Sequence, residues 1–160
     1  MNQGWKRGLQ PLEREVEILL VEDNPNDEEL TLHAFNKYHV SNRLHVVRDG
    51  EEALDFLFAR GAYEGRDLDQ SPRVILLDLK LPKVDGLEVL SQVKNDPRTK
   101  HIPVVLLTSS REERDIVSGY DRGANSYIVK PVDFEQFTEA VRELGLYWLM
   151  LNRPPLPDAN

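Results

Sequence analysis

Residues 74–86 read VILLDLKLPKVDG: four apolar residues in succession, then Asp78, then a turn-rich segment that ends in Asp85-Gly86. The run Val74–Leu77 has the length of a strand. It is continuously apolar rather than alternating, which is typical of a strand buried on both faces in a parallel sheet. The stretch therefore predicts a central strand that delivers one carboxylate to the carboxyl edge of the sheet.

Four more apolar runs of strand length lie on either side of this one. They are Val16–Val21, Leu44–Val47, Val104–Leu107 and Tyr127–Val129. Segments with helical spacing separate them, at residues 25–38, 51–60, 87–94, 112–120 and 134–149. This alternation predicts an α/β fold with a doubly wound, five-stranded parallel sheet. Ligands of such sheets bind beyond the carboxyl ends of the strands.

The domain organisation follows from length and composition. A chain of 160 residues suits one domain, which we expect at residues 15–151. We expect a flexible N-terminal tail at 1–14 and a tail at 152–160, where prolines prevent the last helix from continuing. Residues 61–72 are polar and turn-rich, so they predict a surface loop whose role stays open.

The net charge of −8 disfavours binding to nucleic acid or to an anionic membrane surface. The chain has no cysteine, so it fits a reducing compartment, and we expect the cytoplasm. Neither a signal-peptide core nor a run of 18 apolar residues is present, which argues against secretion and membrane spanning.

Carboxylates follow two of the predicted strands. Glu22 and Asp23 come directly after the first strand, and Asp78 ends the third. Singly, each has an ordinary explanation as a helix-start or turn residue. Together at one edge they would repel, by about 4 kcal/mol for a pair ~4 Å apart at an effective dielectric of 20. The cluster therefore predicts either raised pKa values or a bound cation, and Mg²⁺ (or Mn²⁺) suits these oxygen ligands.

Two more polar residues follow the remaining strands. Thr108 comes after the fourth strand and Lys130 after the fifth. Alone, Thr108 is a routine strand-end residue and Lys130 a solvated charge. With the carboxylates they complete a nucleophile, a metal site, a hydroxyl donor and a point charge, which are the components of phosphoryl transfer.

These motifs resemble the receiver domain of two-component response regulators, the chemotaxis-regulator fold. The matching residues are Glu22-Asp23, Leu77–Pro82 with Asp85-Gly86, Thr108, and Lys130-Pro131 after Gly123-Ala124. The resemblance covers residues 15–150 and implies a flavodoxin-like (βα)5 fold with strand order 2-1-3-4-5. The long 61–72 loop and the sequence of residues 123–133 are similar to those of small regulators paired with bacterial and cyanobacterial phytochrome kinases.

The resemblance implies a role for each matching residue. Asp78 accepts a phosphoryl group from a histidine kinase, of phytochrome type for the narrower match, in a Mg²⁺-dependent reaction. The implied metal ligands are Asp23, Asp78, Glu22 through water, and the backbone carbonyl of Lys80. Lys130 pairs with the phosphoryl group, Thr108 donates its hydroxyl to it, and Tyr127 follows Thr108 as a switch residue. The role of the Lys80 side chain stays open.

The implied function is that of a stand-alone response regulator that signals through a changed protein-interaction surface. It catalyses only its own phosphorylation and dephosphorylation. Near the C-terminus, apolar residues occupy nearly every side of the last predicted helix turns. We expect Tyr147, Trp148, Leu149 and Met150 to form a homodimer interface on the face of the fourth helix, fifth strand and fifth helix. The alternative is that they cover the domain's own core.

Three other functions are weighed. A haloacid-dehalogenase-type phosphohydrolase needs a second aspartate two residues after the nucleophile, where this chain has Lys80. A flavodoxin-like flavin carrier must bind phosphate in its first loop, where Glu22 and Asp23 would repel it. The third is an interaction module without phosphorylation, against which the complete set of site residues argues.

Overall fold

The computed structural model describes residues 16–37, 44–109 and 113–145. Five parallel strands form one sheet in the order β2-β1-β3-β4-β5. The strands are β1 (Ile18–Val21), β2 (Leu44–Val47), β3 (Val74–Asp78), β4 (Val104–Thr108) and β5 (Ser126–Val129). The predicted fold class and strand order are confirmed.

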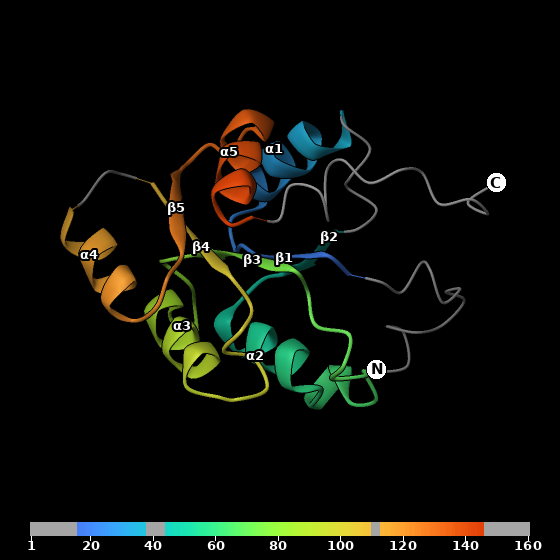
Figure 1. The fold of residues 1–160 in the computed structure, drawn as a ribbon. Helices are drawn as coiled ribbons and strands as arrows, with labels where there is room; N and C mark the ends of the chain where they lie inside the picture. The colour runs from blue at the N-terminus through green and yellow to red at the C-terminus, as the bar shows by residue number, and fades with distance from the viewer. Residues whose placement is uncertain (1–15, 38–43, 110–112, 146–160) are drawn as a thin grey trace.

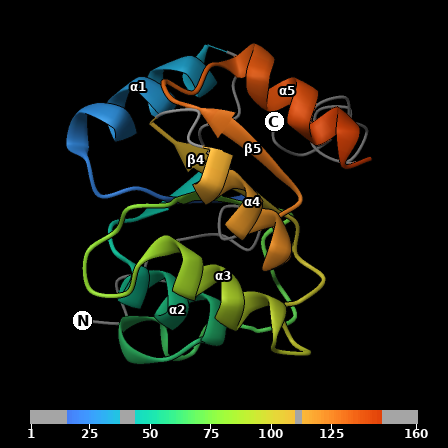
Figure 2. The same ribbon diagram turned by 90° about the vertical axis from the view of Figure 1, so that its left-hand side faces the viewer.

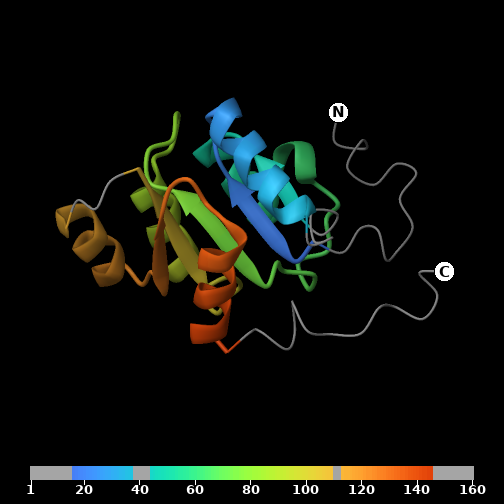
Figure 3. The same ribbon diagram turned by 90° about the horizontal axis from the view of Figure 1, so that it is seen from above.

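Helices cover both faces of the sheet, as Figures 1 and 2 show. They are α1 (Pro25–Asn36), α2 (Gly50–Phe58), α3 (Gly86–Lys94), α4 (Glu113–Asp121) and α5 (Phe134–Glu143), with a short 3-10 helix, η3, at Gly61–Tyr63. Seen from above, α1 and α5 lie over the sheet and α4 lies beyond β5 (Figure 3). The first four of these helices match the predicted segments to within two residues. The last prediction, 134–149, is too long, because α5 ends at Glu143, with Leu144 as its cap and Gly145 at a positive φ of 75°.

The core has two halves, one on each face of the sheet. Alternate residues of β1 enter opposite halves: Leu19 packs toward α2 and α3, and Leu20 packs toward α1 and α5. Phe35 of α1 and Phe137 of α5 fill the second half, with ring centroids 4.7 Å apart. Every residue of β1, β3 and β4 is buried, which confirms the interpretation of their continuous apolar runs.

Side-chain caps set the starts of four helices. Asn24, Asp49, Asp85 and Asp133 each accept a hydrogen bond from a backbone amide in the first turn of α1, α2, α3 and α5, respectively. Such caps satisfy amides that have no partner within the helix. All four caps lie in loops that leave the carboxyl ends of strands, so they fix the loops around that edge.

The 61–72 loop is less exposed than its composition predicts. Tyr63 and Arg66 are both buried. The Arg66 guanidinium lies 4.0 Å from the centroid of the Phe56 ring and donates hydrogen bonds to the carbonyl oxygens of Phe56 and Gln70. One arginine thus ties the part of the loop around Gln70 to α2, although most of the other loop residues face solvent.

None of the helices in the described part of the chain combines the length and the apolar character needed to cross a bilayer. The predicted tails at 1–14 and 152–160 lie outside the described residues, as do the interface residues Tyr147, Trp148, Leu149 and Met150. Those assignments stay predictions.

Candidate functional site

The site is built by the register of four neighbouring strands, β1, β3, β4 and β5. Val21 of β1 pairs with Leu77 of β3, so Glu22 and Asp78 occupy matching positions one step further. In β4, Leu107 pairs with Asp78, and Thr108 pairs with Val129 of β5. All the predicted strand-end residues therefore reach the same edge of the sheet.

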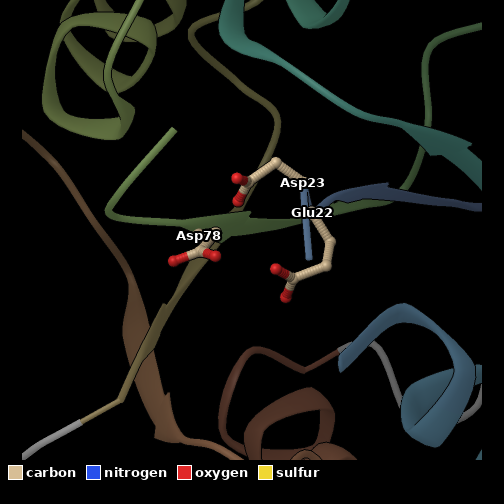
Figure 4. A group of neighbouring side chains, drawn as sticks. All are labelled: Glu22, Asp23 and Asp78. Atoms are coloured by element: carbon tan, nitrogen blue, oxygen red, sulfur yellow. The ribbon is translucent and has the colours of Figure 1, made fainter. Parts of the chain in front are cut away.

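Glu22, Asp23 and Asp78 form a cluster at this edge. Each can offer one carboxylate oxygen so that the three oxygens lie within 4.8 Å of one another. Figure 4 shows their carboxylates around a common space at the ends of β1 and β3. Glu22 and Asp78 are buried, whereas Asp23 is exposed. An all-oxygen set that is open to solvent on one side is the kind of site that binds Mg²⁺ together with water and phosphate.

Lys130 lies against this cluster and partly neutralises it. Its Nζ is 2.9 Å from Asp78 Oδ2 and 3.2 Å from Glu22 Oε1. Burial opposes its charge, but hydrogen bonds to Asp78 and Asp27 and the nearby carboxylate charges raise the pKa of Lys130 above its ordinary value. The ammonium therefore stays charged in the site.

Glu22 shows the electrostatic cost of the cluster. Burial, followed by the hydrogen bond and the charge of Asp78, raises the pKa of Glu22 to about 7, although Lys130 acts in the opposite direction. The sequence predicted that crowded carboxylates need a cation or raised pKa values. The structure shows the lysine cation and a raised pKa at Glu22.

The backbone around Asp78 is held tightly. Asp78 Oδ1 accepts a hydrogen bond from the Lys80 amide at 3.2 Å. The loop after β3 then folds back, so that the Gly86 amide donates to the carbonyl oxygen of Leu79. A Cβ on Gly86 would lie 2.3 Å from the carbonyl oxygen of Asp78. This close approach explains why position 86 of the motif is a glycine.

A cavity of about 290 Å³ opens at the strand ends. Its lining includes Asp23, Asn24, Asp27, Asp78, Leu79, Lys80, Thr108, Ser109 and Lys130. It is large enough for a phosphoryl group and brings the acceptor candidate together with the carboxylate, hydroxyl and ammonium candidates. The amide of Lys80 lies at the site, and its side chain is exposed at the cavity rim.

Tyr127 lies outside this cavity. It is half-buried on β5, next to β4, the strand that carries Thr108. Its ring contacts that of Tyr120 in α4 edge-on, with centroids 6.3 Å apart. Tyr127 therefore packs against α4.

Asp27 is a site residue that the sequence did not single out. Its Oδ2 lies 2.9 Å from Lys130 Nζ. It lies in the first turn of α1, four residues after Asp23, which itself precedes the helix cap Asn24. That spacing was the available signal, but an acidic residue in a first helix turn is ordinarily explained by the helix dipole.

Comparisons with known proteins place the chain in a family. The family model for the response regulator receiver domain matches residues 18–142. This protein belongs to the response regulator receiver family, a family of signalling domains whose function is to be phosphorylated by a kinase.

Two curated relatives cover most of the chain. The probable methanogenesis regulatory protein FilR2 of Methanothrix harundinacea is 46% identical over 140 residues, 88% of this chain and 88% of FilR2. Response regulator Rcp1 of Synechocystis sp. is 39% identical over 132 residues, 82% of this chain and 88% of Rcp1.

Solved structures of similar chains share the fold. The bacteriophytochrome response regulator AtBRR is 56% identical, with a TM-score of 0.77 over 87% of this chain and 99% of that chain. The phosphorylated cyanobacterial phytochrome response regulator RcpA is 41% identical, with a TM-score of 0.68 over 88% and 97%. The Mn²⁺-bound form of Rcp1 is 37% identical, with a TM-score of 0.67 over 88% and 97%.

Proposed function

We propose that this protein is a stand-alone response regulator that accepts a phosphoryl group on Asp78 from a histidine kinase. The observation that carries the proposal is the position of the Asp78 carboxylate. It lies among Glu22, Asp23 and Lys130 at the mouth of a phosphate-sized cavity. The family and the phosphorylated relative support the same function.

The proposed reaction uses one oxygen of Asp78 as the nucleophile. This oxygen forms a bond to phosphorus while the bond from phosphorus to the donor histidine nitrogen breaks, and that nitrogen keeps the electron pair. Lys130 is placed to neutralise charge on the phosphoryl oxygens, and Thr108 to donate its hydroxyl to one of them.

We propose that Asp23, Asp78, Glu22 through water, and the Lys80 carbonyl hold Mg²⁺ or Mn²⁺. The three carboxylates fit a hard divalent cation because they offer only oxygen and leave a side open to solvent. The Mn²⁺-bound form of the relative Rcp1 supports a divalent cation as the ligand. When bound, the ion supplies positive charge that offsets the repulsion between the carboxylates and the phosphate.

We propose that signalling runs from Thr108 to Tyr127. A phosphoryl group adds about −1.5 to −2 charge and three acceptor oxygens, which attract the Thr108 hydroxyl. An inward shift of Thr108 makes room for Tyr127, whose ring contacts Tyr120 of α4. Phosphorylation would thereby change the surface formed by α4, β5 and α5.

That surface is also our proposed homodimer interface. Tyr120 of α4 is 46% exposed and is, with Leu30, one of two exposed large hydrophobic side chains among the described residues. The proposed contacts of Tyr147, Trp148, Leu149 and Met150 would extend it. Light scattering of Trp148→Glu beside the parent tests this, because an unchanged dimer mass would remove Trp148 from the interface.

We propose a phytochrome-type kinase as the phosphodonor and the cytoplasm as the location. The names of AtBRR and RcpA, which link both relatives to phytochromes, support the kinase type. Phosphotransfer rates from a phytochrome-type kinase and from unrelated histidine kinases test it. A preference for an unrelated kinase would contradict the assignment.

The chemistry is tested by incubation with Mg²⁺ and acetyl phosphate, followed by intact mass and phosphate assays. The proposal expects the stoichiometric addition of one phosphoryl group. Continuous phosphate release over many turnovers would favour a phosphohydrolase instead. No mass change and no phosphate release would favour an interaction module without phosphorylation.

A further inference from the structure

Lys130 is shared among three carboxylates, each from a different element. Its Nζ lies 2.9 Å from Asp78 Oδ2 at the end of β3, 2.9 Å from Asp27 Oδ2 in α1, and 3.2 Å from Glu22 Oε1 after β1. An ammonium group has three N–H donors. All three are therefore engaged, and a phosphoryl oxygen must take one of them over.

The three carboxylates differ in burial and in what else they do. The side chains of Glu22 and Asp78 are almost fully buried, whereas that of Asp27 is 31% exposed. Glu22 and Asp78 also belong to the cluster that can hold a metal ion, together with Asp23. Asp27 lies outside that cluster: it lines the same cavity and contacts Lys130, whose own side chain is only 10% exposed.

We propose that Asp27 is a positioning residue that holds Lys130 and limits how strongly its ammonium attracts the phosphoryl group at Asp78. This inference rests on the proposed function, because it assumes that Asp78 is the acceptor. Phosphorylation converts the Asp78 carboxylate to an acyl phosphate. The Lys130 N–H that was donated to Asp78 is then donated to a phosphoryl oxygen. The N–H that is donated to Asp27 stays engaged, and the Asp27 charge opposes the lysine charge and repels the anionic donor.

The role predicts a gain on removal of the Asp27 charge. Asp27→Asn keeps the size of the side chain but leaves more of the Lys130 charge to the phosphoryl group. At saturating Mg²⁺ we expect initial phosphoryl uptake from acetyl phosphate to rise about two- to fivefold, the range for one partly exposed ion pair.

Two variants separate this role from a general effect of charge or of the helix terminus. Glu28→Gln removes the same charge from the same first turn of α1, but Glu28 contacts Arg48. Asp27→Glu keeps the charge. We expect Glu28→Gln and Asp27→Glu to take up phosphoryl at a rate close to that of the parent.

A second readout needs neither metal nor phosphodonor. Hydrogen exchange of the Lys130 ammonium, followed by NMR in the metal-free protein, reports how firmly its N–H groups are held. We expect faster exchange in Asp27→Asn than in Glu28→Gln or the parent. A residue with a purely structural role in α1 would leave this exchange rate unchanged.

Uptake by Asp27→Asn equal to that of Glu28→Gln or Asp27→Glu would overturn the inference, as would unchanged exchange of the Lys130 ammonium. Failure of the proposed function gives a different result. In that case the parent itself takes up no phosphoryl group, while the exchange measurement still tests the link between Asp27 and Lys130.

Discussion

The backbone amide of Lys130 donates a hydrogen bond of 2.7 Å to the carbonyl oxygen of Thr108. This bond continues the β4–β5 ladder one step beyond the pair Thr108 and Val129. The proposed hydroxyl donor and the proposed charge donor are therefore fixed to each other through the backbone. A shift of β4 toward a phosphoryl group would carry with it the carboxyl end of β5, two residues after Tyr127.

Lys130 should stabilise the metal-free fold because it pairs with buried carboxylates. In Lys130→Met the stem can still pack, but Glu22 and Asp78 lose their cation. We expect the free energy of unfolding from urea titration to fall by about 3 kcal/mol. Added Mg²⁺ should restore part of the loss. Lys83→Met, at a lysine that is 61% exposed, should cost less than about 1 kcal/mol. Equal losses in the two variants would contradict the assigned pairing.

His45 should make stability depend on pH. Burial, with the charges of Arg66 and Arg48, lowers its pKa from 6.5 to about 4, although Glu52 acts in the opposite direction. The unfolded chain therefore binds a proton at higher pH than the folded one. This stabilising contribution is present above pH 6.5 and is lost as the pH falls through about 4.

Between pH 6.5 and about 4, we expect the free energy of unfolding to fall by about 2–3 kcal/mol. His45→Phe should flatten the curve, whereas His101→Phe, at an exposed histidine, should not. Urea unfolding at a series of pH values measures this. A slope that persists in His45→Phe would assign it to other groups.

Gly86 should be intolerant of a side chain. An added Cβ would meet the Asp78 carbonyl oxygen at 2.3 Å and the Leu79 Cα at 2.7 Å, both of which are backbone atoms. We expect Gly86→Ala to destabilise the fold by about 2–3 kcal/mol and to slow phosphoryl uptake, because the end of β3 must shift. Gly145→Ala, where only the positive φ of 75° opposes a side chain, should cost about 1 kcal/mol. A Gly86→Ala protein as stable as the parent would contradict this prediction, because it would show that the loop between β3 and α3 can shift at little cost.

Asp23 should contribute directly to metal affinity. It is the exposed member of the carboxylate cluster, so its loss should disturb the fold little. We expect Asp23→Asn to weaken Mg²⁺ binding by about tenfold or more, measured by calorimetry. Asp85→Asn, which keeps the capping side chain of α3, serves as the control. Unchanged affinity in Asp23→Asn would exclude this residue as a ligand.

The sequence predicted the fold because local patterns and packing agree in it. The continuous apolar runs at Ile18–Val21, Val74–Leu77 and Val104–Leu107 can be satisfied only by burial on both faces. Once these strands are parallel, their last residues must meet at one edge. The grouping of Glu22, Asp23, Asp78 and Lys130 therefore followed from the order of elements.

Other features depend on contacts that no local pattern reveals. The buried position of Arg66 arises from its stacking on Phe56, ten residues earlier. An arginine in a polar loop otherwise predicts exposure. Asp27 likewise has an ordinary helix-start explanation until the structure places Lys130, which is 103 residues away, against it. The switch roles of Thr108 and Tyr127 and the interface role of residues 147–150 stay predictions.

The most direct test of the central claim is transfer of radiolabelled phosphate from an autophosphorylated histidine kinase to this protein. The parent and Asp85→Asn, at an exposed aspartate seven residues from the acceptor, should both become labelled when Mg²⁺ is present. Asp78→Asn should stay unlabelled although it folds. Labelling of Asp78→Asn at the rate of the parent would contradict the assignment of Asp78 as the phosphoryl acceptor.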